Sequence, residues 1–185
     1  KRDVLIEEDF KKFIADTNPD LKEEEVTQIY DSVRLVGAES DFATLHKVYN
    51  WMVDGIQFTP QDGIARMIPL IDFEKDGNNI FRVVNQFTVE YTNNGQKENR
   101  RPDVILFVNG MPLCVVELKN PADANATIYD AWEQINIRYW RDIPHLLHYC
   151  PLACISDGVK TRLGTVRTPY EHFYAWRRVN DGDAV

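Results

Sequence analysis

The hydrophobic positions of the first 60 residues repeat with the period of an α-helix. Three stretches place apolar side chains three and four residues apart, and we expect one helix from each. We expect the first helix to end at Asn18-Pro19 and the third near Gly55. The second should begin with a capping box of Asp20 and Glu23 and end at Gly37. The apolar positions are Ile6, Phe10, Phe13 and Ile14, then Val26, Ile29, Tyr30 and Val33, then Phe42, Leu45, Val48, Tyr49 and Met52.

From residue 64 onward the pattern changes to that of strands. Residues 64–73 and 80–91 are rich in apolar and β-branched side chains, and each predicts a strand, with a turn at residues 76–79 between them. The polar residues 92–101 predict a loop. Two apolar runs then flank Asn109-Gly110, an arrangement typical of a β-hairpin.

The last part of the pattern is a helical stripe over residues 124–141, followed by a short apolar strand over residues 149–156. A helix between two strands of one sheet usually crosses over so that the strands run parallel. We therefore expect an α/β fold with a mixed central sheet flanked by helices. One compact domain is expected, with a helical part at 1–55, the sheet-bearing core at 56–178 and a frayed tail at 179–185.

Charge and composition narrow the classes of protein. The net charge is −8, and residues 1–60 carry 7 basic and 13 acidic side chains, against 14 and 16 in the rest. An acidic chain is a poor stand-alone binder of nucleic acid. The chain has no run of about 18 apolar residues, and its N-terminus is too charged for a secretory signal. With three cysteines only, we expect a cytoplasmic protein with reduced thiols and no membrane span.

Three charged residues bracket the hairpin, which is otherwise apolar. Asp103 precedes its first strand, and Glu117 and Lys119 end its second. Two neighbouring carboxylates repel each other unless a cation lies between them, and Mg²⁺ prefers carboxylates, waters and a phosphate as ligands. A lysine on the same face can stabilise the developing charge, so the set suits metal-assisted hydrolysis of a phosphodiester. The alternative is that all three are solvated strand-end charges.

The hairpin register decides whether the three charges can act together. A two-residue loop at 109–110 pairs Asp103 with Val116 and places Asp103 and Glu117 on opposite faces. A three-residue loop at 108–110 pairs Asp103 with Val115, on the face of Glu117. We expect the three-residue loop with Gly110 at positive φ; otherwise a bulge must correct the phase.

A zinc site is the rival reading of the cysteines and histidines. His145, His148, Cys150 and Cys154 are closely spaced, but the spacing fits no common zinc site, and both cysteines fall in an apolar run. We therefore do not expect zinc.

The wider sequence resembles a known family. Asp103 after proline, with Glu117-x-Lys119 across a hairpin, resembles the PD-(D/E)xK nuclease superfamily. The sequence around these residues resembles the N-terminal nuclease domain of the R subunit of type I restriction-modification enzymes. The resemblance covers about residues 64–177 and rests on the segments PLIDFEKDGNNIFRVVNQFTVEY, RRPDVILFVNGMPLCVVELKNPADANATIYDAWEQI and ISDGVKTRLGTVRTPYEHFYAWR.

The resemblance implies roles for individual residues. Asp103 and Glu117 would ligate Mg²⁺, and Lys119 would complete the catalytic set. The family also carries a glutamine and a tyrosine four residues apart on the following helix. Gln134 fits, but position 138 is arginine, and helical spacing turns Tyr139 away from Gln134. For DNA contacts we expect basic residues in loops beside the site, namely Lys97, Arg100, Arg101, Lys160 and Arg162.

The resemblance also implies partners. An R subunit continues into an ATP-driven DNA translocase, whereas this chain has no G-x-x-x-x-G-K-[ST] motif and is not expected to bind ATP itself. The implied activity is Mg²⁺-dependent cleavage of double-stranded DNA, together with specificity and methyltransferase subunits. A catalytically silent docking module of that assembly, or a free-standing nuclease of the superfamily, are the alternatives.

Overall fold

A six-stranded sheet forms the centre of the molecule. This computed structural model describes residues 3–36, 40–61, 63–122 and 127–175, and the strand order is β10-β9-β8-β7-β6-β3. All neighbours are antiparallel except β7 and β8, which are parallel, so the predicted mixed sheet with an antiparallel hairpin is confirmed. The strands are β3 Phe81–Asn85, β6 Val104–Val108, β7 Met111–Leu118, β8 Leu152–Ser156, β9 Thr161–Thr165 and β10 Tyr174–Ala175.

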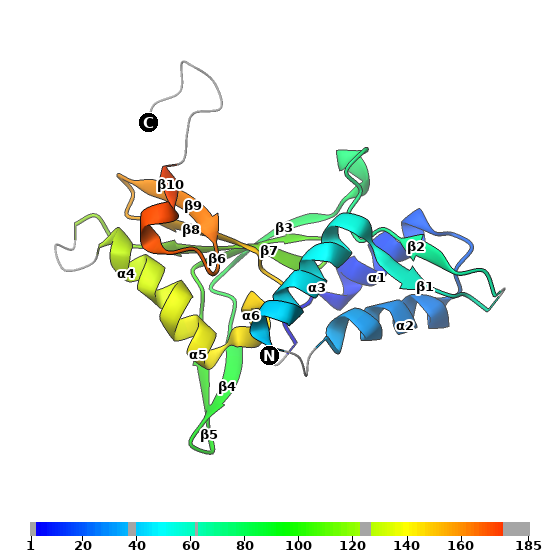
Figure 1. Ribbon diagram of the computed structural model, residues 1–185, viewed down its shortest axis with the longest axis horizontal. Helices are drawn as coiled ribbons and strands as arrows, with labels where there is room; N and C mark the ends of the chain where they lie inside the picture. Colours follow the sequence, from blue (N-terminus) through cyan, green and yellow to red (C-terminus); the bar gives the residue numbers. More distant parts are fainter. Residues whose placement is uncertain (1–2, 37–39, 62, 123–126, 176–185) are drawn as a thin grey trace.

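The three predicted N-terminal helices are confirmed. They are α1 Glu7–Thr17, α2 Glu23–Arg34 and α3 Asp41–Asp54. Gly55 ends α3 at a φ of 88°, a left-handed conformation that glycine adopts without a steric penalty. The helices lie with the hairpin of β1 (Ile56–Phe58) and β2 (Arg66–Ile68) at the end of the molecule opposite to β9 and β10 (Figure 1).

The predicted capping box of α2 is wrong in its residues. The helix begins at Glu23, and the Glu25 carboxylate accepts from the backbone N–H of Lys22 at 2.8 Å and of Gln61 at 2.7 Å. These bonds hold the pKa of Glu25 below its usual value. Asp20 instead pairs with Arg66 on β2. Gly37, the predicted end of the helix, lies outside the described residues.

The two long strands predicted before the hairpin are confirmed only in part. Only Arg66–Ile68 of residues 64–73 forms a strand, whereas the predicted turn at residues 76–79 contains the short 3₁₀ helix η1 (Asp76–Asn78). The predicted strand 80–91 is broken because Gln86 has a φ of 54°, which turns the chain out of the sheet. Its second half forms a separate element.

The predicted loop 92–101 is instead most of a β-hairpin. Strands β4 (Val89–Asn93) and β5 (Gln96–Arg100) pair across Asn94 and Gly95, which have φ values of 47° and 80°. Positive φ at both positions is the signature of a type I′ turn. Figure 1 shows this hairpin projecting away from the central sheet, next to α5.

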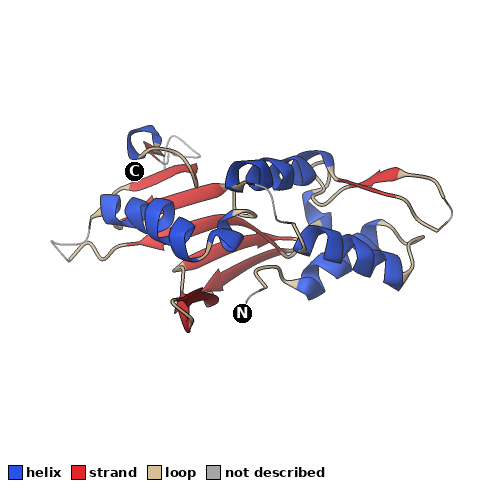
Figure 2. Ribbon diagram, turned by 60° about the horizontal axis from the view of Figure 1, so that its bottom comes forward, coloured by secondary structure: helices blue, strands red, loops and turns tan. Residues whose placement is uncertain are grey.

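The helix predicted at 124–141 is confirmed over its described part, but it changes type along its length. It consists of α4 (Ile128–Glu133), the π-helix η2 (Gln134–Tyr139) and α5 (Trp140–Asp142), and the short α6 (Pro144–Leu147) follows. Residues 124–126 lie outside the described part. The helix crosses one face of the sheet and contacts β7 and β8 (Figure 2).

A single hydrophobic cluster connects the N-terminal helices to the sheet. Phe10, Phe13 and Ile14 of α1 share it with Ile105 and Val115 of the hairpin strands. At its edge, the Arg82 guanidinium on β3 pairs with the Asp9 carboxylate on α1 at 2.6 Å. No helix within the described residues is long and apolar enough to cross a membrane.

Candidate active site

A bulge in the hairpin brings Asp103 opposite Glu117. The loop is the two-residue type I′ turn, with Asn109 at φ 49° and Gly110 at φ 76°, so the predicted three-residue loop is wrong and the positive φ of Gly110 is confirmed. Phe107 pairs with Pro112, but Leu106 pairs with Cys114, which leaves Leu113 as an extra residue on β7.

The bulge reverses the parity that the short loop would have set. Val104 pairs with Val116. In the same register, the residue before Val104 is opposite the residue after Val116, so Asp103 faces Glu117. The backbone N–H of Leu118 donates to Asp103 Oδ2 at 2.9 Å, which fixes the aspartate at this end of the hairpin. The bulge thus places Asp103 and Glu117 on the same face of the sheet. This outcome is the one predicted for a hairpin without the longer loop.

Glu117 is a buried carboxyl group with two hydrogen-bond donors. Its side chain is 0% exposed, Tyr139 donates its hydroxyl to Oε1 at 2.5 Å, and Gln134 donates Nε2 to Oε2 at 2.7 Å. Burial, with a smaller contribution from the charge of Asp103, raises the pKa of Glu117 to about 8, against the lowering effect of the hydrogen bond from Tyr139. A buried carboxyl with a raised pKa beside a second carboxylate is typical of functional sites.

Lys119 and Gln134 extend this network. Lys119 lies two residues after Glu117 and so on the same side of the chain, and its Nζ donates to Gln134 Oε1 at 2.7 Å. Gln134 therefore links the lysine to the glutamate. Asp103, Glu117, Lys119 and Gln134, which were selected from the sequence, are brought together by the fold.

Tyr139 belongs to the same network, contrary to the helical spacing. In a regular α-helix Gln134 and Tyr139 diverge, but the segment between them is a π-helix, whose wider turn brings positions five apart to one side. Gln134 Nε2 also donates to the Tyr139 hydroxyl at 2.9 Å. The expectation that Tyr139 faces away is therefore wrong, because it assumed a regular α-helix.

The carboxylates have the capacity to hold a divalent cation. Each oxygen of Glu117 and of Asp103 accepts a side-chain or backbone hydrogen bond from a described residue, and the donors to Asp103 are Gln86 Nε2 and Leu118 N. A carboxylate oxygen has a second lone pair, which remains for a metal. Among the described residues no three His, Cys, Asp or Glu side chains group into a metal site. Two carboxylates suit Mg²⁺, which keeps several waters and uses substrate phosphate as a ligand.

The prediction that all five DNA-contact residues lie in loops is wrong for three of them. Lys97 and Arg100 lie on β5 and Arg162 on β9, not in loops. Arg100 pairs with Asp142 at 2.6 Å, and the Arg162 guanidinium lies 5.0 Å from the Tyr170 ring centroid. Only two of the five lie outside strands. Arg101 lies two residues before Asp103. Lys160 follows β8, whose carboxyl end lies next to the carboxyl end of β7.

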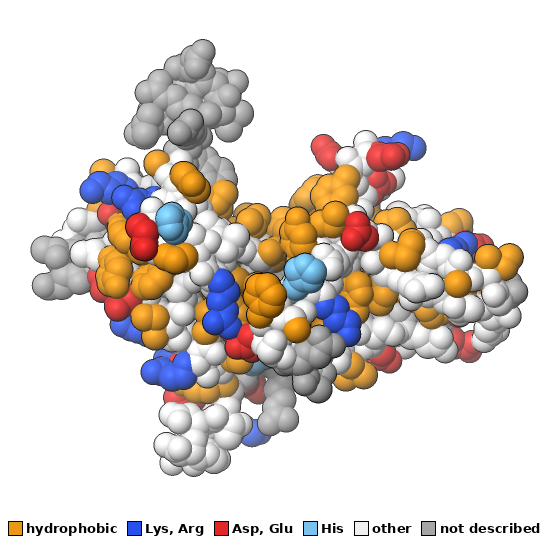
Figure 3. Space-filling view, viewed as in Figure 1, with side chains coloured by type: hydrophobic (Ala, Val, Ile, Leu, Met, Phe, Trp, Pro, Cys, Tyr) orange, Lys and Arg blue, Asp and Glu red, His pale blue; other side chains and the backbone are white. Residues whose placement is uncertain are grey.

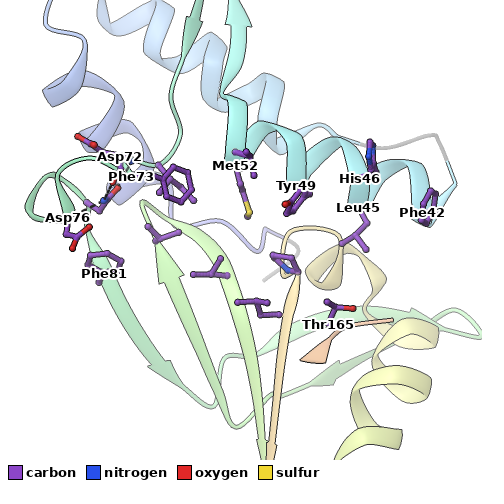
Figure 4. A pocket seen from close by; sticks show the side chains of 17 residues that line it. Phe42, Leu45, His46, Tyr49, Met52, Asp72, Phe73, Asp76, Phe81 and Thr165 are labelled. Carbon is purple, nitrogen blue, oxygen red and sulfur yellow. Dashed lines mark hydrogen bonds between the residues drawn. The ribbon is translucent and has the colours of Figure 1, made fainter. Parts of the chain in front are cut away.

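An apolar hollow lies on the other face of the sheet. It has a volume of about 590 Å³ between α3 and the strands, and Figure 4 shows Leu45 and Met52 pointing into it from α3. Leu152 lines it, three residues before the partner of Glu117 on β8 and so on the opposite face. Hydrophobic side chains gather along α3 in the space-filling view (Figure 3). This groove lacks the carboxyl–lysine set and is not the candidate site.

We expect the buried Glu117 to make stability depend on pH when no metal is bound. Its folded pKa of about 8 lies above the usual 4.5, so folding favours the protonated form. The contribution is complete below about pH 4.5 and is lost as the pH rises to about 8. In EDTA, the free energy of unfolding of wild type relative to Glu117→Gln should fall by up to about 1.4 kcal/mol per pH unit in that window. Urea denaturation from pH 5 to 9 measures it, and a pH-independent difference would contradict the burial argument.

Comparisons with known proteins agree on one family. The family described as "Type I restriction enzyme R protein N terminus" matches residues 1–172. The chain is 35% identical to the type I restriction enzyme HindI endonuclease subunit of Haemophilus influenzae, over 96% of this chain and 17% of that protein. It is 34% identical to a Methanocaldococcus jannaschii protein provisionally named as the type I restriction enzyme MjaIXP endonuclease subunit, over 100% of this chain and 18% of that protein. The chain thus spans less than a fifth of the length of these two relatives.

Proposed function

Because the chain belongs to the family of type I restriction enzyme R protein N termini, we propose that Asp103, Glu117, Lys119 and Gln134 form a nuclease centre that hydrolyses phosphodiester bonds of double-stranded DNA with Mg²⁺. Membership confirms the resemblance drawn from residues 64–177. The observation that carries the proposal is the buried Glu117, which faces Asp103 and is linked to Lys119 through Gln134.

Each residue has a distinct task in this proposal. Asp103 and Glu117 would hold Mg²⁺, which supplies positive charge to the attacked phosphate and lowers the pKa of a bound water. Lys119 stabilises the negative charge that the phosphate gathers in the transition state. Gln134 holds the lysine and the glutamate in place through its amide group, whose oxygen accepts from Lys119 and whose nitrogen donates to Glu117. Tyr139 donates to Glu117 and fixes the rotamer of that carboxylate.

The larger assembly is also part of the proposal. The endonuclease subunits that the chain matches are more than five times its length, which leaves room for an ATP-driven motor in the same polypeptide. The specificity and methyltransferase subunits would supply site recognition. A silent docking module is the competing function, and the joined set of Asp103, Glu117 and Lys119 favours the nuclease, because docking requires no buried carboxyl beside a second one.

We expect Mg²⁺ or Mn²⁺ to bind weakly between the two carboxylates. Isothermal titration at pH 8 should detect binding to wild type, and Asp103→Asn and Glu117→Gln should each abolish it, because each removes one of the two carboxylates of an already weak site. Glu24→Gln, an exposed change on α2, is the control and should bind as wild type does. Equal binding by wild type and both site variants would refute the metal centre.

The activity itself is tested with supercoiled plasmid. The chain, and separately the full-length R protein assembled with its partner subunits and ATP, is incubated with plasmid in Mg²⁺ and in EDTA. Metal-dependent nicking that is lost in Asp103→Asn supports the nuclease. Absence of nicking by the full assembly would favour the docking module.

A further inference from the structure

A second hollow, which is polar, adjoins the hydrogen-bond network of Glu117, Lys119, Gln134 and Tyr139. It has a volume of about 490 Å³ and lies between the π-helix η2 and the segment that runs from β5 toward Asp103. Gln134 and Tyr139, which both bind Glu117, form part of its wall. Its other lining residues are Gln86, Asn99, Arg100, Arg101 and Arg138.

The lining carries positive charge that the described protein does not neutralise. Arg101 and Arg138 are exposed, and neither has an ion-pair partner within residues 3–36, 40–61, 63–122 and 127–175. Arg100, by contrast, is bound to Asp142 and lies over the Tyr91 ring. Among the residues that the structure describes, no carboxylate lines the hollow. The guanidinium group of an arginine can donate two hydrogen bonds to a phosphate, and neighbouring side-chain amides can donate to its other oxygens.

The π-turn places Arg138 at this hollow. A turn one residue wider than an α-helical turn lets Tyr139 reach Glu117, and Arg138, the preceding residue, lines the hollow beside it. A ligand in the hollow would therefore lie beside Gln134 and Tyr139, the two side chains that donate to Glu117. That position suits the phosphate next to the one that is cut on the same strand.

We propose that this hollow binds a backbone phosphate of double-stranded DNA, held by Arg101 and Arg138, and so positions the strand over Asp103 and Glu117. The proposal rests on the proposed nuclease function, whose substrate it places. It adds Arg138 to the DNA contacts and separates Arg101 from Arg100, whose charge is already paired with Asp142. Double-stranded DNA, the substrate of the proposed function, brings successive phosphates to both places at once.

Fluorescence anisotropy with a labelled 25-base-pair duplex in EDTA tests the proposal without cleavage. Arg101→Gln and Arg138→Gln should each bind about tenfold more weakly at low salt, because each loses one charge-assisted contact to phosphate. Each should also lower the slope of log affinity against log salt concentration by about one. Arg34→Gln, an exposed change on α2 with its partner Asp31 nearby, is the matched control and should change neither.

The outcomes separate this proposal from the proposed function. Unchanged affinity and slope in both variants, an equal loss in Arg34→Gln, or no duplex binding by wild type would overturn the phosphate site. Plasmid nicking is measured separately in Mg²⁺. Weakened binding in both variants without any nicking by wild type, alone or assembled, would support the phosphate site and refute the nuclease.

Discussion

Replacing Lys119 by alanine is expected to lower the rate of DNA cleavage by about 10²–10³-fold while leaving DNA affinity nearly unchanged. The Lys119 amine reaches Gln134 at the centre of the network, and its charge matters most when the attacked phosphate gathers negative charge. In the assembled enzyme, ATP hydrolysis and translocation should continue. Single-turnover cleavage and duplex binding, measured on the same preparation, separate the two effects.

Two further variants show whether the charge is responsible. Lys119→Met keeps most of the packed stem, removes the charge and should be as inactive as Lys119→Ala. Lys12→Ala removes an exposed lysine of α1 that pairs with Asp16, and should cleave like wild type. A Lys119→Ala enzyme that cuts at nearly the wild-type rate would show that this lysine is only a strand-end charge.

Replacing Gly110 by alanine is expected to cost roughly 3 kcal/mol or more in the free energy of unfolding. Gly110 has a φ of 76°, and a Cβ there would lie 2.2 Å from the Ile6 carbonyl oxygen and 2.8 Å from the Phe10 nitrogen. Those atoms are backbone, and the Ile6 N–H donates to the Gly110 carbonyl at 2.8 Å, so α1 and the turn cannot separate without losing that bond. Urea denaturation measures the loss.

Gly95 provides the matched control. It occupies the second position of the other type I′ turn at a φ of 80°, and a Cβ there would meet nothing within 4 Å. Gly95→Ala should therefore cost only the left-handed backbone penalty, about 1 kcal/mol. Equal destabilisation by the two changes would contradict the close approach of α1 to the hairpin.

The hairpin shows how far the sequence predicted the site. Asn109-Gly110 located the turn, and the need to bring Asp103 and Glu117 together predicted either a longer loop or a bulge. Hydrophobicity could not choose, because both faces of the strands are apolar. Pro112 is the signal that was missed: it has no N–H for the ladder, and proline within a sheet favours a bulge.

The second Asn-Gly pair shows the opposite failure. Asn94-Gly95 has the same turn signature, but the residues on either side of it are mostly polar, and this polarity predicts a loop. Their strands pair nevertheless, and the base is anchored by the buried Val89 and by the ion pair of Arg100 with Asp142. Apolar alternation detects only strands that are buried on one side, so a projecting hairpin escapes it.

Tyr139 could not be placed from spacing alone. A helical wheel assumes 3.6 residues per turn, and over Gln134–Tyr139 the backbone has a π-helical turn instead. The family pattern of glutamine and tyrosine four residues apart was the available clue. An extra residue between them is what a π-turn accommodates, so the mismatch at Arg138 marked the distortion.

The central claim is that Glu117 belongs to a metal-dependent nuclease centre. Plasmid cleavage in Mg²⁺, by wild type and Glu117→Ala, in the chain alone and in the full complex, tests it most directly. Wild type should nick or cut in the complex, Glu117→Ala should do neither, and the exposed change Glu24→Ala should retain full activity. Cleavage by Glu117→Ala at the wild-type rate would contradict the account.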